Sequence, residues 1–138
     1  MPRLILAVLL IASLSLLTAC DGPGAVAPGE TATHTGELGS GDSTLVSGEF
    51  YDEYPLSGKS GGTYKITLTS EAFDPYIIVM SADGDWQREI DDSTEGDFNE
   101  SVLEVTLPDS GRYAIAVTTF EPGESGAYTL TVENTGSK

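Results

Sequence analysis

The chain has 138 residues with 22 acidic and 6 basic side chains, which gives a formal net charge of −16 at pH 7. Such a surface repels phosphate groups, because nucleic-acid binding needs lysine and arginine to replace released counterions, and nucleic acid is therefore excluded as a partner. The length allows one domain and a tether, and the single cysteine excludes an intramolecular disulfide.

Residues 1–19 have the organisation of an export signal. Pro2 and Arg3 form a short basic n-region, and the apolar run Leu4–Leu17 follows it. Fourteen residues are too few for a helix that crosses a bilayer core of roughly 30 Å, but they suit the h-region of a signal peptide. We therefore expect removal of this segment from the mature protein.

Residues 17–20 read Leu-Thr-Ala-Cys and resemble the lipobox of bacterial lipoproteins. The resemblance implies cleavage before Cys20, a diacylglycerol on its sulfur and acylation of the new amine. Two or three acyl chains give a nearly permanent membrane anchor, whereas one gives only marginal binding. The expected location is the cell envelope, on the periplasmic or extracellular side. Cleavage removes one basic and no acidic residue, so the mature charge is −17.

Residues 20–41 are rich in Gly, Ala, Thr, Pro and Ser, a composition typical of a flexible spacer. A flexible chain of this length has ends about 25 Å apart on average. His34, the lone histidine, lies within this segment, and we interpret it as a solvated linker residue with no rigid neighbours.

Residues 42–138 alternate between apolar and polar side chains, are interrupted by glycine turns, and show no helical periodicity. This pattern predicts an all-β domain, an antiparallel sandwich of seven or eight strands. Pro55 confines the first strand to an edge, and the continuously apolar run 76–80 indicates a central strand covered on both sides or at a sheet junction. The predicted strands are 50–56, 63–69, 76–80, 86–90, 101–107, 112–120 and 128–132.

Three strands begin with a Ser-Gly turn followed by a tyrosine, at Tyr64, Tyr113 and Tyr128. Glycine supplies the positive φ of a tight reversal, and each tyrosine begins an inward row with its hydroxyl at the rim. We favour core packing of these rings, and a carbohydrate-stacking platform is the alternative.

Several dispersed segments resemble the bacterial pre-peptidase C-terminal domain, over residues 36–133. The resemblance implies a jelly-roll-like β-sandwich of the kind appended to secreted proteases, without catalytic activity of its own, with collagen-binding relatives that take calcium. No peptidase accompanies the domain in this chain. The segments that carry the resemblance are Phe73–Val79, Asp83-Gly84, Asp91–Ser93, Leu107–Tyr113 and Gly126–Leu130.

The residue types give no support to catalysis. A Ser-His-Asp triad needs a positioned histidine, a lipidated Cys20 cannot act as a nucleophile, and ligands for zinc are lacking. Carboxylates crowd residues 83–100, where Asp91, Asp92 and Asp97 are candidate calcium ligands. A solvated acidic turn is the alternative, and no cofactor other than calcium is expected.

Two hypotheses about function remain. In the first, a membrane-anchored, non-catalytic module binds a protein, peptide or polysaccharide of the envelope. In the second, an acidic structural or calcium-binding surface protein has no defined macromolecular partner. A shared outward patch of Phe50, Tyr51, Trp86 and Phe120 would favour binding, whereas scattered or buried rings would favour the second hypothesis.

Overall fold

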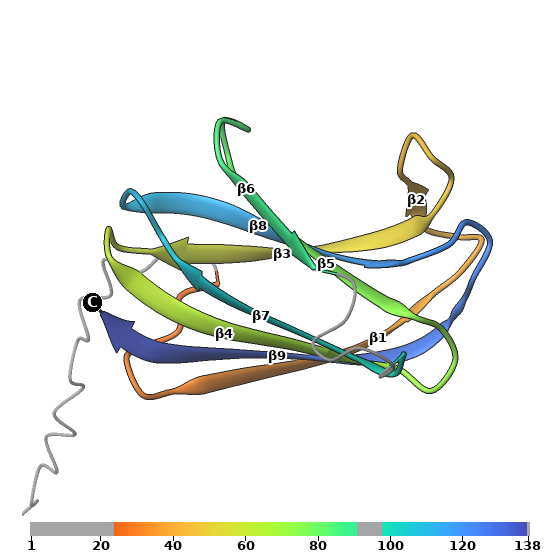
Figure 1. The fold of residues 1–138 in the computed structure, drawn as a ribbon, viewed down its shortest axis with the longest axis horizontal. Helices are drawn as coiled ribbons and strands as arrows, with labels where there is room; N and C mark the ends of the chain where they lie inside the picture. The colour runs from red at the N-terminus through yellow and green to blue at the C-terminus, as the bar shows by residue number, and fades with distance from the viewer. Residues whose placement is uncertain (1–23, 91–97, 138) are drawn as a thin grey trace, which may run out of the picture.

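The computed structural model describes residues 24–90 and 98–137, which form two antiparallel sheets packed face to face (Figure 1). No helix in this part of the chain is long and apolar enough to span a membrane. The strands are β1 (Thr31–Leu38), β2 (Ser43–Thr44), β3 (Phe50–Gly58), β4 (Gly62–Thr69), β5 (Pro75–Ser81), β6 (Gln87–Ile90), β7 (Glu100–Thr106), β8 (Gly111–Thr119) and β9 (Gly126–Ser137).

The strand order confirms the predicted jelly-roll-like sandwich. One sheet has the order β1-β9-β4-β7 and the other β2-β3-β8-β5-β6. Without the two-residue strand β2, eight strands remain. Counted from one to eight in chain order, they are arranged 1-8-3-6 in one sheet and 2-7-4-5 in the other, which is the arrangement of an eight-stranded jelly roll. All seven predicted strands are present, and β1 and β2 raise the count to nine.

The inward rows of the two sheets form the core, as the alternation predicted. Three of these rows begin with the turn tyrosines, and Tyr64, Tyr113 and Tyr128 are only 3%, 6% and 3% exposed. Gly61 and Gly126, in two of the turns before these tyrosines, have φ angles of 81° and 140°. Core packing is thus the role of these rings, and the alternative of a carbohydrate-stacking platform is wrong.

The prediction of a flexible spacer up to residue 41 is wrong, because β1 lies within it. This strand pairs with β9 over its whole length, from Thr31 opposite Glu133 to Leu38 opposite Gly126. Ordered contacts begin earlier still, since the Ser57 amide donates to the Gly24 carbonyl over 3.4 Å. The domain therefore starts near residue 24 and not at residue 42.

Periodicity did not reveal β1 because its inward positions do not form a row of large apolar side chains. They are Ala32, His34 and Gly36, and only Leu38 at the end is a fully buried large side chain. An edge strand needs few apolar groups when its backbone is paired and its partner strand supplies the core. His34 is correspondingly not a linker residue: it lies on β1, and its ring is 4.8 Å from that of Tyr54, although its side chain is exposed.

The other positional predictions for the strands are largely confirmed. Pro55 lies at an open edge, since β2 pairs with β3 only at Phe50 and Tyr51. Strand β5 is central, between β8 and β6. The opposite sheet covers one side of β5, whereas on the other side Tyr76 and Ile78 line a depression of about 350 Å³. Ile78 is nevertheless only 9% exposed, so the expected cover on both sides holds in the middle of the strand, whereas Tyr76 and Met80 are half-buried.

A polar cluster joins the two sheets along the side where β1 faces β3. The Tyr128 ring passes over Gly36 of β1, and its hydroxyl donates to Asp52 Oδ2 at 2.5 Å. The Tyr54 and Tyr128 hydroxyl oxygens are 2.6 Å apart, and Tyr54 is the donor because the Tyr128 proton is directed to Asp52. The path of the ring requires glycine, since a Cβ on Gly36 would lie 2.3 Å from the Tyr128 hydroxyl oxygen.

We predict that Gly36→Ala destabilises the domain by about 1–3 kcal/mol, because the added methyl group displaces a hydrogen-bonded tyrosine. Urea unfolding of the mature chain measures the effect. Gly39→Ala is the matched control, since a Cβ there meets nothing within 4 Å. Equal stability of the two variants would show that the Tyr128 ring relaxes freely.

The same cluster predicts a loss of stability at high pH. Burial of the phenol raises the pKa of Tyr128, and its hydrogen bonds to Asp52 and Tyr54 add to the rise. The contribution of Tyr128 to the free energy of unfolding is complete below about pH 10, where tyrosine of the unfolded chain is protonated. It decreases above pH 10 by about 1.4 kcal/mol per pH unit, because the unfolded chain loses a proton that the folded protein keeps.

The Tyr128→Phe variant should therefore lose less unfolding free energy between pH 10 and pH 11 than the protein that retains Tyr128. Urea titrations at pH 8, 10 and 11 measure this slope. Tyr51→Phe, on the outward face of β3, is the control of identical chemistry. An unchanged slope in Tyr128→Phe would contradict the role of the buried hydroxyl.

Candidate functional site

Exposed apolar side chains gather at one end of the sandwich, which we call the distal end. It carries the β2–β3, β4–β5 and β8–β9 connections, at the right in Figure 1, and lies opposite the end that holds Gly24 and the C-terminus. Among the described residues, the large hydrophobic side chains that are exposed are Val46, Phe98 (62%) and Phe120 (48%). Val46 and Phe120 lie in distal connections, and Phe98 precedes β7 at the same end, where the Ser70 amide donates to the neighbouring Asn99 carbonyl at 3.0 Å. Grouped exposed apolar residues are typical of interaction surfaces.

Phe98 and Phe120 line the same depression, of about 460 Å³, which we call the acidic–aromatic depression. Carboxylates surround the two rings, and no lysine or arginine contributes to the lining. The remaining lining residues are Glu71, Ala72, Phe73, Asp74, Asn99, Glu121 and Glu124. The depression thus combines apolar contact area with negative charge.

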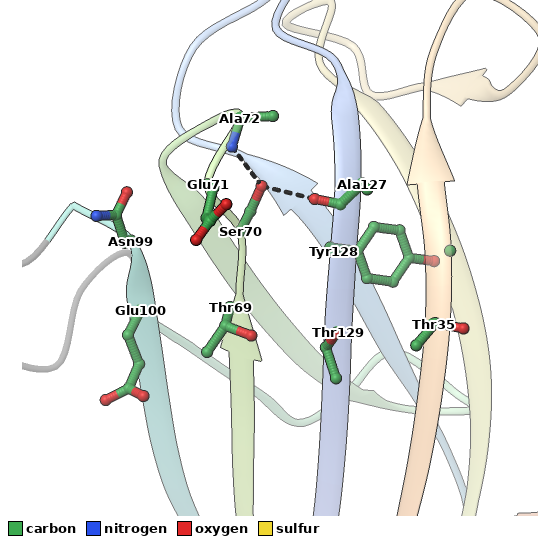
Figure 2. A pocket seen from close by; sticks show the side chains of 11 residues that line it. Thr35, Thr69, Ser70, Glu71, Ala72, Asn99, Glu100, Ala127, Tyr128 and Thr129 are labelled. Atoms are coloured by element: carbon green, nitrogen blue, oxygen red, sulfur yellow. Dashed lines mark hydrogen bonds between the residues drawn. The ribbon is translucent and has the colours of Figure 1, made fainter.

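A second depression, of about 900 Å³, adjoins the first on the outward face of the four-stranded sheet (Figure 2). Its floor is a row of threonines on three neighbouring strands, Thr35, Thr129 and Thr69. Exposed strand positions favour threonine, and cross-strand threonine pairs stabilise a sheet. The two depressions share Glu71, Ala72 and Asn99, so they form one continuous surface around the β4–β5 connection.

Ser70 fixes the β4–β5 connection that stands between the depressions. Its hydroxyl donates to the Ala127 carbonyl at 2.8 Å and accepts from the Ala72 and Phe73 amides at 3.1 and 3.3 Å. Figure 2 shows the bonds of Ser70 with Ala127 and Ala72, which link this connection to β9. Phe73 is buried beneath it at 5% exposure. The connection is therefore held in one conformation by the core.

The β8–β9 connection is fixed in a similar way. The Thr119 hydroxyl donates to the Glu121 carbonyl at 2.6 Å, and the Glu121 amide donates to Glu124 Oε2 at 3.3 Å. Gly126 lets this connection lie against the previous one, because a Cβ at Gly126 would be 2.2 Å from the Cβ of Ala72. The exposed Phe120 is thus carried by a rigid frame.

Charge is distributed unevenly between the two ends. The described basic residues lie in the half nearer Gly24: Lys59 in the β3–β4 turn, Arg112 at the start of β8, and Lys65 and Arg88 within β4 and β6. The distal connections carry acidic residues and no described basic residue. Positive charge on an approaching protein is therefore attracted to the distal end.

The four aromatic residues singled out from the sequence do not form one patch. Phe50 and Trp86 are partly buried and pack against the core. Trp86 lies near the opposite end, with its ring 5.6 Å from that of Tyr113. Tyr51 is half-buried on the outward face of β3, and Phe120 alone of the four is exposed. These four rings do not supply the patch that would favour binding.

Other residues named from the sequence lie outside the described part of the chain. These are the lipidation candidate Cys20 and the calcium candidates Asp91, Asp92 and Asp97. Within residues 24–90 and 98–137, no group of three or more potential ligands is arranged to hold a metal ion.

Asp83, in the same acidic stretch, has a structural role. The Ser81 hydroxyl donates to its carboxylate at 2.5 Å and the Asp85 amide at 3.0 Å, which lowers the pKa of Asp83. Gly84 follows with a φ of 80°, so Asp83 and Gly84 form the turn of the β5–β6 hairpin.

Sequence reasoning missed Phe98 because it stands alone in an acidic connection and belongs to no periodic row. A large apolar residue between Asp97 and Asn99, outside any predicted strand, was the available signal. Its proximity to Phe120 depends on the pairing of β4 with β7 and of β8 with β5, which sequence spacing does not reveal.

No protein-family model matches the chain, and no curated protein sequence matches it. Among solved structures, it is similar to two periplasmic inhibitors of g-type lysozyme. PliG of Aeromonas hydrophila is 17% identical, with a TM-score of 0.52 over 80% of this chain and 95% of the inhibitor. PliG of Salmonella Typhimurium is 14% identical, with a TM-score of 0.51 over 81% of this chain and 98% of the inhibitor. At these identities the likeness establishes the fold.

Proposed function

We propose that this protein is a lipoprotein of the cell envelope, anchored at Cys20, whose sandwich binds a protein partner through its distal end and performs no chemistry. The observation that carries the proposal is the pair of exposed rings, Phe98 and Phe120, in an acidic depression on a rigid frame. Exposed aromatic anchors that are already ordered favour binding, because little conformational entropy is lost in the complex.

The solved structures of similar fold support a protein as the partner. Both neighbours are periplasmic inhibitors of g-type lysozyme, and each is covered almost completely by this chain. We therefore propose a g-type lysozyme as the first partner to test. The charge of the mature chain, −17, favours partners with a basic surface, since opposite charge accelerates encounter.

A short tether would direct the distal end away from the membrane. Three residues separate Cys20 from Gly24, and an extended chain covers at most about 3.6 Å per residue, so Gly24 would lie within about 14 Å of the lipidated cysteine. This is shorter than the spacer of about 25 Å expected from residues 20–41. The anchored end would be the one opposite Phe98 and Phe120, and tethering would raise the local concentration of the binding surface.

We predict that the mature chain carrying Cys20→Ser binds a g-type lysozyme and inhibits its hydrolysis of cell walls. The double variant Phe98→Ser and Phe120→Ser should weaken binding at least tenfold, because it removes the apolar anchors without disturbing the core. Isothermal titration calorimetry measures the affinity. Pro108→Ser, an exposed apolar position at the opposite end, is the control. Equal binding by the double variant would place the interface elsewhere.

We predict that Cys20→Ser moves the full-length protein from the membrane fraction to the soluble fraction, because acyl chains provide the anchor. Fractionation after expression in a bacterium with lipoprotein-processing enzymes measures the distribution. Mass spectrometry of the unsubstituted protein should find a chain that begins at Cys20 with added acyl mass. Membrane retention of the Cys20→Ser protein would contradict lipid anchoring.

A further inference from the structure

We infer that the acidic–aromatic depression receives an arginine or lysine side chain of the partner, carried beside an apolar residue. The inference rests on the proposed function, in which the distal end binds a protein, and it specifies the chemistry of the segment that binds. It follows from the composition of the depression, the absence of lysine and arginine from its described lining and the rigidity of its frame.

The lining offers the two kinds of group that bind an organic cation. The exposed rings of Phe98 and Phe120 provide π faces and apolar area, and Glu71, Glu121 and Glu124 provide negative charge beside them. A cation over an aromatic ring is stabilised by the ring quadrupole, and its aliphatic stem packs on the same apolar surface. Arginine suits this arrangement better than lysine, since its planar guanidinium stacks on a ring while donating to carboxylates.

Within residues 24–90 and 98–137, no basic side chain supplies this cation. The described lysine and arginine residues, Lys59, Lys65, Arg88 and Arg112, lie outside the lining of the depression and in the other half of the sandwich. Glu71 makes no hydrogen bond or ion pair with any residue that the structure describes, and Glu124 accepts only the Glu121 amide, at 3.3 Å. A bound guanidinium would thus relieve the repulsion between neighbouring carboxylates.

Other occupants fit less well. A metal ion needs several converging oxygen ligands, and in residues 24–90 and 98–137 no set of three acidic or histidine side chains has that arrangement. A second copy of the same chain would bring a surface of like charge to the distal end, which opposes association. A basic, partly apolar segment is complementary in both charge and polarity.

The experiment uses a short peptide and is independent of lysozyme. Amide shifts of the ¹⁵N-labelled mature chain carrying Cys20→Ser are followed during titration with acetyl-Ala-Arg-Leu-Arg-Ala-amide. The expected result is saturable shifts at Glu71, Ala72, Phe98 and Glu121, and at least fivefold weaker binding when glutamine replaces both arginines. Equal shifts with the glutamine peptide, or shifts confined to the opposite end, would overturn the inference.

Matched variants separate local recognition from total charge. The double variant Glu71→Gln with Glu124→Gln should bind the arginine peptide at least fivefold more weakly. The control, Glu104→Gln with Glu133→Gln on the outward face of the four-stranded sheet, should bind it with unchanged affinity. Phe98→Leu with Phe120→Leu keeps apolar area and removes the π faces, so it should also weaken binding. Equal losses in the two charge-neutralised variants would reduce the effect to overall electrostatics and would contradict a specific depression.

The outcomes distinguish this inference from the proposed function. Binding of the arginine peptide without binding of lysozyme would support the depression and reject lysozyme as the partner. The opposite result has two parts: lysozyme binds equally well to the Glu71→Gln with Glu124→Gln variant, and the peptide causes no site-specific amide shifts. That result would support a protein-binding function and overturn the inference.

Discussion

The pairing of β1 with β9 is the interaction on which the remaining structure depends. It supplies the first strand of the jelly roll and brings Gly36 under the Tyr128 ring, whose hydroxyl reaches Asp52 on the opposite sheet. The same strand β9 begins at Gly126 and Ala127, where Ala72 packs and the Ser70 hydroxyl donates. One ladder of backbone hydrogen bonds therefore both closes the sandwich and fixes the connection that carries the candidate site.

The candidate site joins two properties that proteins usually keep apart, exposed aromatic rings and a concentration of negative charge. Keeping Phe98 and Phe120 in water costs free energy, and gathering carboxylates beside them adds repulsion. A partner that brings apolar and cationic groups relieves both costs at once. The described basic residues lie in the other half of the molecule, away from this distal charge.

Dispersed segments of the sequence resemble the pre-peptidase C-terminal domain, and this assignment stays a prediction, whereas the solved structures of similar fold are periplasmic lysozyme inhibitors. A shared fold does not by itself transfer a function, so the proposal depends on the exposed residues at the distal end and not on the likeness.

The sequence by itself determined the core. Alternating rows such as Tyr64, Ile66 and Leu68 predicted β4 to within one residue, because a strand buried on one face must alternate with period two. Only the tertiary structure decided the place of β1 and the position of Phe98 and Phe120 at one depression. An edge strand is held by backbone hydrogen bonds, which any side chain permits, and a surface site is assembled by pairings between distant segments. Neither the edge strand nor the surface site therefore produces a periodic pattern in the sequence.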